Sequence, residues 1–428
     1  MRVDIPDMFT KHKLKNGIRF ITAPMTSTKT VTVLAVIGAG SKYENKKNNG
    51  ISHFLEHMFF KGTKKRPTSQ DIAGELDKVG GEYNAFTGQE YTGYYAKVDA
   101  SHLDLALDVI SDMLINSKFD AQEIEKEKGV IIEEINMYRD TPRRYVGELF
   151  EKLLYGDQPA GWHIAGEKEN ILKFKRPDFS DYLKNHYTAS NMAIAVAGNF
   201  NKDLLDKKIN SYFGKITNGK AKGKEKVREK QDNPESLLHY KKTDQTHFCL
   251  GVRTYDMFHS SKFAQEISAI ILGGNMSSRL FTEVREKRGL AYYVYTDTGK
   301  YTDSGYLVSQ AGVDNKRVNE AIEVIVAEYK KIKKDGISET ELVKAKDYIK
   351  GKMALNLESS DEVAGFLADQ EILKNKIELP EEILRQINKV TINEVNNLAK
   401  DIFQLQKLNL ALIGPFKDKK RFEKLLVL

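Results

Sequence analysis

Cysteine, proline and long apolar runs are scarce in this sequence of 428 residues, which has one cysteine (Cys249) and nine prolines. A single cysteine excludes an intramolecular disulfide and favours a reducing compartment, so we expect a cytoplasmic protein. The apolar stretches stop far short of the ~20 residues that a membrane-spanning helix needs. The start of the sequence lacks the apolar segment of a secretory signal. We therefore expect a soluble protein with no membrane partner.

The charge balance does not favour nucleic-acid binding. The 67 Lys and Arg are nearly balanced by 60 Asp and Glu, which leaves a net charge of +7. Much of the excess lies in residues 215–230 (KITNGKAKGKEKVREK), which have no apolar periodicity and are typical of a solvated linker. No RNP, KH or zinc-knuckle pattern is present. We predict no nucleic-acid partner.

A basic linker, residues 215–236, separates two halves (1–214 and 237–428) that repeat the same order of elements. Residues 191–200 and 407–416 each predict a buried strand and a glycine turn, followed by an amphipathic helix. Any two α/β segments can look alike at this level, but the shared order favours an internal duplication.

Within the first half, strand-like and helical segments are grouped rather than strictly alternating. The predicted strands are 14–23, 30–38 and 91–98, and the predicted helices are 51–60, 69–79, 103–115 and 121–138. This grouping favours an α+β fold. We predict two homologous α/β sandwich halves, each with an antiparallel-rich sheet covered by helices.

The segment SHFLEHMFF (residues 52–60) carries the strongest chemical signal. His53 and His57 are four residues apart, so a helix places both imidazoles on one face, as two ligands of one Zn²⁺ require. Glu56 lies near that face and could take a proton from a zinc-bound water whose pKa falls toward ~7. The alternative is a chance spacing in a chain with nine histidines.

This H-x-x-E-H order is the inverzincin motif, and with four longer segments it resembles the M16 (pitrilysin-type) metallopeptidases. The segments are residues 50–63, 80–87, 130–142 and 272–292. The chain is most similar to the M16B group, which includes short bacterial peptidases and the β-subunit of the mitochondrial processing peptidase. The resemblance implies a zinc-dependent endopeptidase of unfolded peptides, with one Zn²⁺ per chain and duplicated α/β halves.

A third protein ligand should come from the acidic helix over residues 120–138, in which Glu133 and Glu134 are adjacent. Glu127 and Glu134 share one stripe of this helix, and Glu133 lies about 100° away. The resemblance implies that Glu134 is the ligand. It also implies that Glu127 does not bind the metal itself but holds a ligand histidine or tunes the metal.

The resemblance also suggests how a peptide is held. It implies that substrate pairs with the strand over residues 80–87, at Asn84, Ala85 and Phe86, where a free sheet edge would supply backbone hydrogen bonds. The residues alone are equally consistent with a plain hairpin strand. From the second half, Arg285 and Tyr292 match a pair that stabilises the oxyanion. The alternative is that Arg285 and Arg288 make structural ion pairs.

One chain supplies one catalytic half and one helper half, with a chamber between them implied by the resemblance. Short family members assemble two chains, and the intact zinc residues favour a homodimer. The alternative is a non-catalytic scaffold or partner subunit of an M16-type heterodimer. A metal-dependent hydrolase of non-peptide substrates is a more distant possibility.

Overall fold

The computed structural model describes residues 9–428, which divide into two compact units, each built around one β-sheet. The first unit comprises residues 9–135, His163–Glu225 and Lys352–Glu378. The second comprises Asn136–Trp162, Lys226–Gly351 and Leu379–Leu428. Two sheets that are each covered by helices confirm the predicted α+β architecture. Within residues 9–428, every helix is too short or too polar to cross a membrane.

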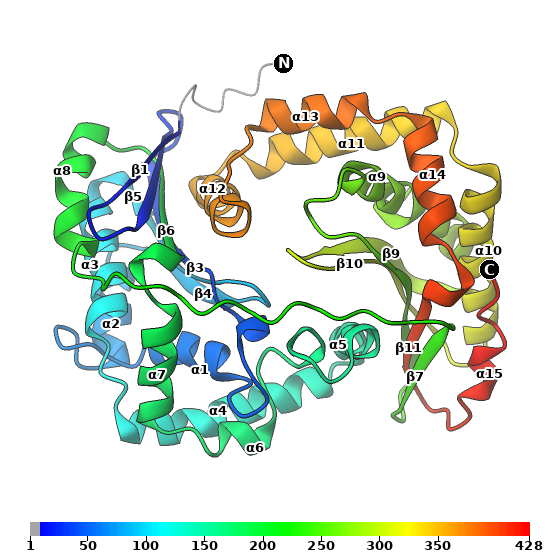
Figure 1. The fold of residues 1–428 in the computed structure, drawn as a ribbon, viewed down its shortest axis with the longest axis horizontal. Helices are drawn as coiled ribbons and strands as arrows, with labels where there is room; N and C mark the ends of the chain where they lie inside the picture. The colour runs from blue at the N-terminus through cyan, green and yellow to red at the C-terminus, as the bar shows by residue number, and fades with distance from the viewer. Residues whose placement is uncertain (1–8) are drawn as a thin grey trace. The chain divides into compact units, whose positions relative to one another are not determined.

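The first sheet has six strands in the order β1-β2-β6-β3-β5-β4 (Figure 1). In chain order they are β1 (Thr10–Lys13), β2 (Arg19–Pro24), β3 (Thr30–Ile37), β4 (Glu82–Thr87), β5 (Thr92–Asp99) and β6 (Met192–Gly198). Neighbouring strands are antiparallel except β2 and β6, which are parallel. β6 (MAIAVAG) is buried throughout because it lies inside the sheet, with both faces covered.

Alternate residues of β3 contribute to the two faces of this sheet. Val31 and Val33 belong to the larger core, together with residues of α1, α3 and α4. Leu34 and Val36 belong to a smaller core with α12.

The helices of this unit are α1 (Ile51–Met58), α2 (Ser69–Asp77), α3 (Leu103–Asn116), α4 (Ala121–Arg139, of which residues up to 135 belong to this unit), α6 (Lys168–Ile171), α7 (Arg176–His186), α8 (Lys202–Phe213) and α12 (Ser360–Lys374).

The second sheet has the order β7-β11-β8-β10-β9, with β7 and β11 parallel. Its strands are β7 (Glu235–Tyr240), β8 (Gln245–Thr254), β9 (Ala291–Lys300), β10 (Gly305–Asp314) and β11 (Leu408–Gly414). The helices are α5 (Pro142–Tyr155), α9 (Lys262–Gly273), α10 (Val318–Asp335), α11 (Glu339–Asn356, to residue 351), α13 (Pro380–Lys389), α14 (Ile392–Ile402) and α15 (Lys420–Glu423). Strands β7 to β11, taken in chain order, have the same positions and directions in the second sheet as strands β2 to β6 have in the first sheet.

Each unit also contains one helix from the other half of the sequence. Helix α12 follows the second sheet's first four strands in the chain, yet its residues Val363, Ala364 and Leu367 pack on the first sheet. Helix α5 precedes the second sheet in the chain, yet Val146 and Phe150 pack on that sheet. Residues 217–231, within the basic segment, form neither helix nor strand.

Candidate metal centre

The short helix α1 carries the H-x-x-E-H motif, and a buried carboxylate holds its first turn. Gly50, the residue before the helix, has φ of +99°, and an added Cβ would lie 2.8 Å from a backbone oxygen, so glycine is required there. Glu44 accepts hydrogen bonds from the backbone N–H groups of Gly50 and Ser52, both at 2.8 Å. The Asn49 amide donates to the same carboxylate at 3.0 Å. Burial raises the pKa of Glu44 to about 7.

His53, His57 and Glu134 lie together, with one ligand atom from each within 4.8 Å of the others. Nε2 of His53 is 3.6 Å from Oε2 of Glu134, and Nε2 of His57 is 3.3 Å from the same oxygen. The histidines come from successive turns of α1, and the carboxylate comes from α4. Glu133, the neighbour of Glu134, is exposed.

A second carboxylate on α4 orients one of these imidazoles. Nδ1 of His57 is 2.8 Å from Oε1 of Glu127, and Nζ of Lys61 is 2.6 Å from the other oxygen. Glu127 is buried. In the neutral imidazole, a proton on Nδ1 that is donated to Glu127 leaves the lone pair of Nε2 free on the side of Glu134.

The pKa values show an excess of negative charge around the imidazoles. Hydrogen bonds from His53 and His57 hold the pKa of Glu134 well below its ordinary value. Burial by itself lowers the pKa of His57, but hydrogen bonds to Glu127 and Glu134 raise it overall to about 9. The two carboxylates therefore favour positive charge at this point, which is what a divalent cation supplies.

The donor set fits a zinc ion. Two imidazole nitrogens and one carboxylate are the ligand types of catalytic zinc sites, which keep a fourth position open. Two ligand atoms that each lie about 2.1 Å from a tetrahedral zinc are roughly 3.4 Å apart. The observed separations of 3.3 Å and 3.6 Å are close to this value. His53, His57 and Glu134 are therefore the residues that could hold Zn²⁺.

Glu56 is held in place by the strand beside α1. Oγ1 of Thr87, the last residue of β4, donates to Oε2 of Glu56 at 2.6 Å. Glu56 lies three residues after His53 and one before His57, so its carboxylate leaves the helix about 60° around the axis from His53.

The strand β4 lies at the end of the first sheet, and among the described residues it pairs only with β5. Its residues alternate, so that Asn84 and Phe86 are exposed and Ala85 is buried. Phe86 faces Gly93 across the strand pair, and a Cβ on Gly93 would lie 2.1 Å from the Phe86 ring. The outer edge of β4 therefore offers backbone groups that have no neighbouring strand.

Arg285 and Tyr292 belong to the second unit and lie close to each other. Nη1 of Arg285 donates to the backbone oxygen of Tyr292 at 2.7 Å, and the Tyr292 side chain is exposed. Arg288, rather than Arg285, makes the ion pair with Glu283, at 2.6 Å.

Family comparisons agree with the resemblance drawn from the motifs. Residues 19–168 match the family model described as Insulinase (Peptidase family M16), and residues 173–349 match the model described as Peptidase M16 inactive domain. The chain belongs to peptidase family M16. The relative YmxG of Bacillus subtilis, named an uncharacterized zinc protease, is 38% identical over 409 residues, which cover 95% of this chain and 98% of that one.

Solved structures support the M16 fold. A protease from Helicobacter pylori superposes with a TM-score of 0.88 at 24% identity, covering 95% of this chain and 99% of that chain. A chain of complex III2 from Candida albicans superposes with a TM-score of 0.84 at 19% identity, covering 98% of this chain and 100% of that chain. At these identities the likeness concerns the fold alone.

In this M16 protein, two residues outside the predicted site hold its parts in place. Glu44 holds the start of α1, and Thr87 holds Glu56. Thr87 is the last residue of the segment 80–87 that resembles the M16 family, and no other feature of the sequence indicates its role. Glu44 is one of many carboxylates in the chain, and nothing local marks it as a helix cap.

Proposed function

We propose that this M16 protein is a zinc-dependent endopeptidase of unfolded peptides, with one Zn²⁺ per chain held by His53, His57 and Glu134. The observation that carries the proposal is the cluster of these three side chains. Glu56 lies on the same helix α1 as the two histidines, and its hydrogen bond from Thr87 connects it to β4, the strand at the free edge of the sheet. When bound, Zn²⁺ supplies a Lewis acid that polarises a carbonyl oxygen and acidifies water.

In this proposal the residues of the chain bind the substrate and move the proton. An extended peptide adds to the edge of β4 along Asn84, Ala85 and Phe86, through backbone hydrogen bonds that tolerate many sequences. Glu56 takes a proton from the water that attacks the scissile carbonyl carbon. It then delivers that proton to the amide nitrogen as the C–N bond breaks.

Glu127 has a positioning role, because it fixes the tautomer of His57. Arg285 and Tyr292 are the proposed donors to the oxyanion that forms at the carbonyl. This role and the chamber between the halves rest on the family resemblance. The homodimer and the cytoplasmic location are also predictions.

A second candidate is a non-catalytic subunit of an M16-type assembly. The match of residues 173–349 to a model named for an inactive domain is compatible with it, and so is the fold shared with a complex III2 chain. The intact set of His53, Glu56 and His57 favours the peptidase. Zinc stoichiometry separates the two, since a scaffold has no need of a bound metal.

The experiment that tests the proposal is Glu56→Gln, with Glu133→Gln as a matched control on an exposed residue. Glu56→Gln should bind zinc at the wild-type stoichiometry and lose hydrolysis of an unstructured peptide, because the amide cannot take the proton. Glu133→Gln should keep both properties. Normal turnover in Glu56→Gln would exclude this residue as the base.

A further inference from the structure

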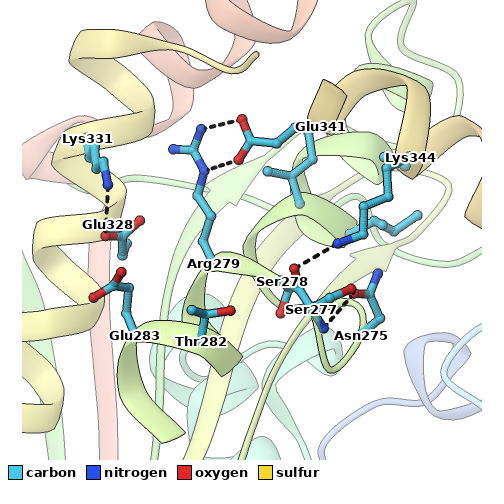
Figure 2. A pocket seen from close by; sticks show the side chains of 13 residues that line it. Asn275, Ser277, Ser278, Arg279, Thr282, Glu283, Glu328, Lys331, Glu341 and Lys344 are labelled. Atoms are coloured by element: carbon cyan, nitrogen blue, oxygen red, sulfur yellow. Dashed lines mark hydrogen bonds and ion pairs between the residues drawn. The ribbon is translucent and has the colours of Figure 1, made fainter. Parts of the chain in front are cut away.

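Ion pairs outside the metal centre connect distant segments within each unit. In the second unit, Nε and Nη2 of Arg279 donate to the two carboxylate oxygens of Glu341 at 2.6 Å and 2.8 Å, beside a cavity of about 270 Å³ (Figure 2). This pair connects the segment after α9 to α11. In the first unit, ion pairs lie at the turn between β4 and β5, next to the strand that is proposed to bind substrate.

The turn between β4 and β5 is held by the segment that precedes α1. The backbone N–H of Ser41 donates to the backbone oxygen of Gly88 at 3.3 Å. The backbone N–H of Lys42 donates to the backbone oxygen of Gln89 at 2.8 Å. A Cβ added to Gly40 would lie 2.2 Å from the oxygen of Gly88, so the two segments are in close contact. The turn therefore packs directly against the residues before α1.

Two lysines from distant parts of the chain share one carboxylate of this turn. Nζ of Lys42 is 3.1 Å from Oε1 of Glu90, and Nζ of Lys224 is 3.3 Å from the same oxygen. The side chains of Lys42 and Glu90 are 1% and 3% exposed, and that of Lys224 is 12% exposed. A buried carboxylate needs a charged partner, because the loss of its hydration is costly. These ion pairs therefore restrain the turn more strongly than exposed ones would.

Lys224 belongs to the basic segment, for which the sequence predicts a solvated linker. Most of this segment is exposed, yet it is attached to the first unit. The backbone N–H of Ala189 donates to the oxygen of Thr217 at 2.9 Å, and the backbone N–H of Lys222 donates to the oxygen of Asn185 at 3.0 Å. The largely buried side chain of Lys224 is a further attachment, and it reaches the β4–β5 turn.

The turn adjoins the residues that would carry out the reaction. Thr87, which directly precedes the turn, donates to Oε2 of Glu56 at 2.6 Å. The segment that holds the turn continues to Glu44, which accepts hydrogen bonds from the start of α1. One short segment, residues 40–44, therefore contacts both the helix that carries the histidines and the turn beside Thr87. A displacement of the turn would move Thr87 away from Glu56.

We propose that Glu90 and Lys224 are positioning residues of this site. Their ion pair holds the β4–β5 turn in the place from which Thr87 reaches Glu56. The expected effect on turnover rests on the proposed peptidase function, whereas the effect on the turn does not. Lys224 is the residue to replace, because Glu90 then keeps Lys42 as a partner and no buried carboxylate is left unpaired.

The first test is hydrogen–deuterium exchange of the full chain without added zinc or peptide, read by mass. Lys224→Met should speed exchange in residues 86–93 roughly threefold or more, because the turn opens more often. Lys220→Met, at an exposed position of the same segment, should exchange as the wild type does.

Three results of this experiment would overturn the proposal. The first is unchanged exchange of the turn in Lys224→Met. The second is equal acceleration in Lys224→Arg and Lys224→Met, because the charge would then have no part in holding the turn. The third is faster exchange throughout the first unit, including α3, because the effect would then be global rather than local.

The second test is steady-state hydrolysis of an unstructured peptide by the zinc-loaded chain. Lys224→Met should lower kcat about 3- to 10-fold at unchanged zinc content, and Lys224→Arg should recover most of the loss. A loosened turn with the kcat of the wild type would overturn the positioning role. If the wild type does not cleave the peptide, the proposed function fails, whereas the exchange experiment still confirms or overturns the hold of Lys224 on the turn.

Discussion

Replacing Glu127 by Gln should weaken zinc binding without unfolding the chain. The Glu127 carboxylate accepts from Nδ1 of His57 at 2.8 Å and pairs with Nζ of Lys61 at 2.6 Å. A Gln side chain of the same shape has one acceptor oxygen for these two donors and turns an N–H₂ group toward the other. Outer partners of ligand histidines typically contribute 10- to 100-fold in metal affinity, which is about 1.4–2.8 kcal/mol. We expect a loss of this size.

The assay is competition for zinc with a chromogenic chelator, alongside a thermal midpoint for each variant. Glu133→Gln is the matched control, because Glu133 lies on the same helix and is exposed. Its zinc affinity should equal that of the wild type. An affinity of Glu127→Gln within twofold of the wild type would refute the claim that Glu127 orients His57 for a metal.

Three further predictions concern neighbouring parts of the first unit. Thr87→Val removes the donor to Glu56 and should lower kcat for peptide hydrolysis about 10- to 100-fold, with zinc content unchanged; an unaltered kcat would contradict this. Glu44→Gln leaves one acceptor oxygen for three N–H donors and should lower the free energy of unfolding in urea by about 1–3 kcal/mol; unchanged stability would show that the cap is dispensable. Burial raises the pKa of Asp369 from 3.8 to about 6, so the folded chain keeps a proton that the unfolded chain releases, and stability falls as pH rises across this window. Asp369→Asn should therefore raise stability near neutral pH by up to about 3 kcal/mol and have little effect near pH 4; equal effects at the two pH values would be inconsistent with this pKa.

The spacing of residues along the sequence predicted the helices and strands whose formation depends on neighbouring residues. The four-residue spacing of His53 and His57 places both rings on one face of any helix, and the structure has that helix. The apolar run at 192–198 forms a buried strand, because a strand inside a sheet with both faces covered is apolar throughout. The repeated order of elements agrees with the matching strand orders of the two sheets.

Contacts between distant segments could not be derived in this way. Glu134 lies 77 residues after His57, and only the family resemblance distinguished it from Glu133. The residues of α5 and α12 do not indicate which sheet each helix covers, so their positions on the sheets of the opposite halves follow only from the structure. The roles of Glu44 and Thr87 likewise arise from tertiary contacts.

The most direct test of the central claim is cleavage of an unstructured peptide by the purified zinc-loaded chain, with fragments identified by mass. We predict internal cuts that disappear with a chelator, return when zinc is restored and are absent from Glu56→Gln. Cleavage that persists in the chelated protein or in Glu56→Gln would contradict a zinc-dependent mechanism with Glu56 as base.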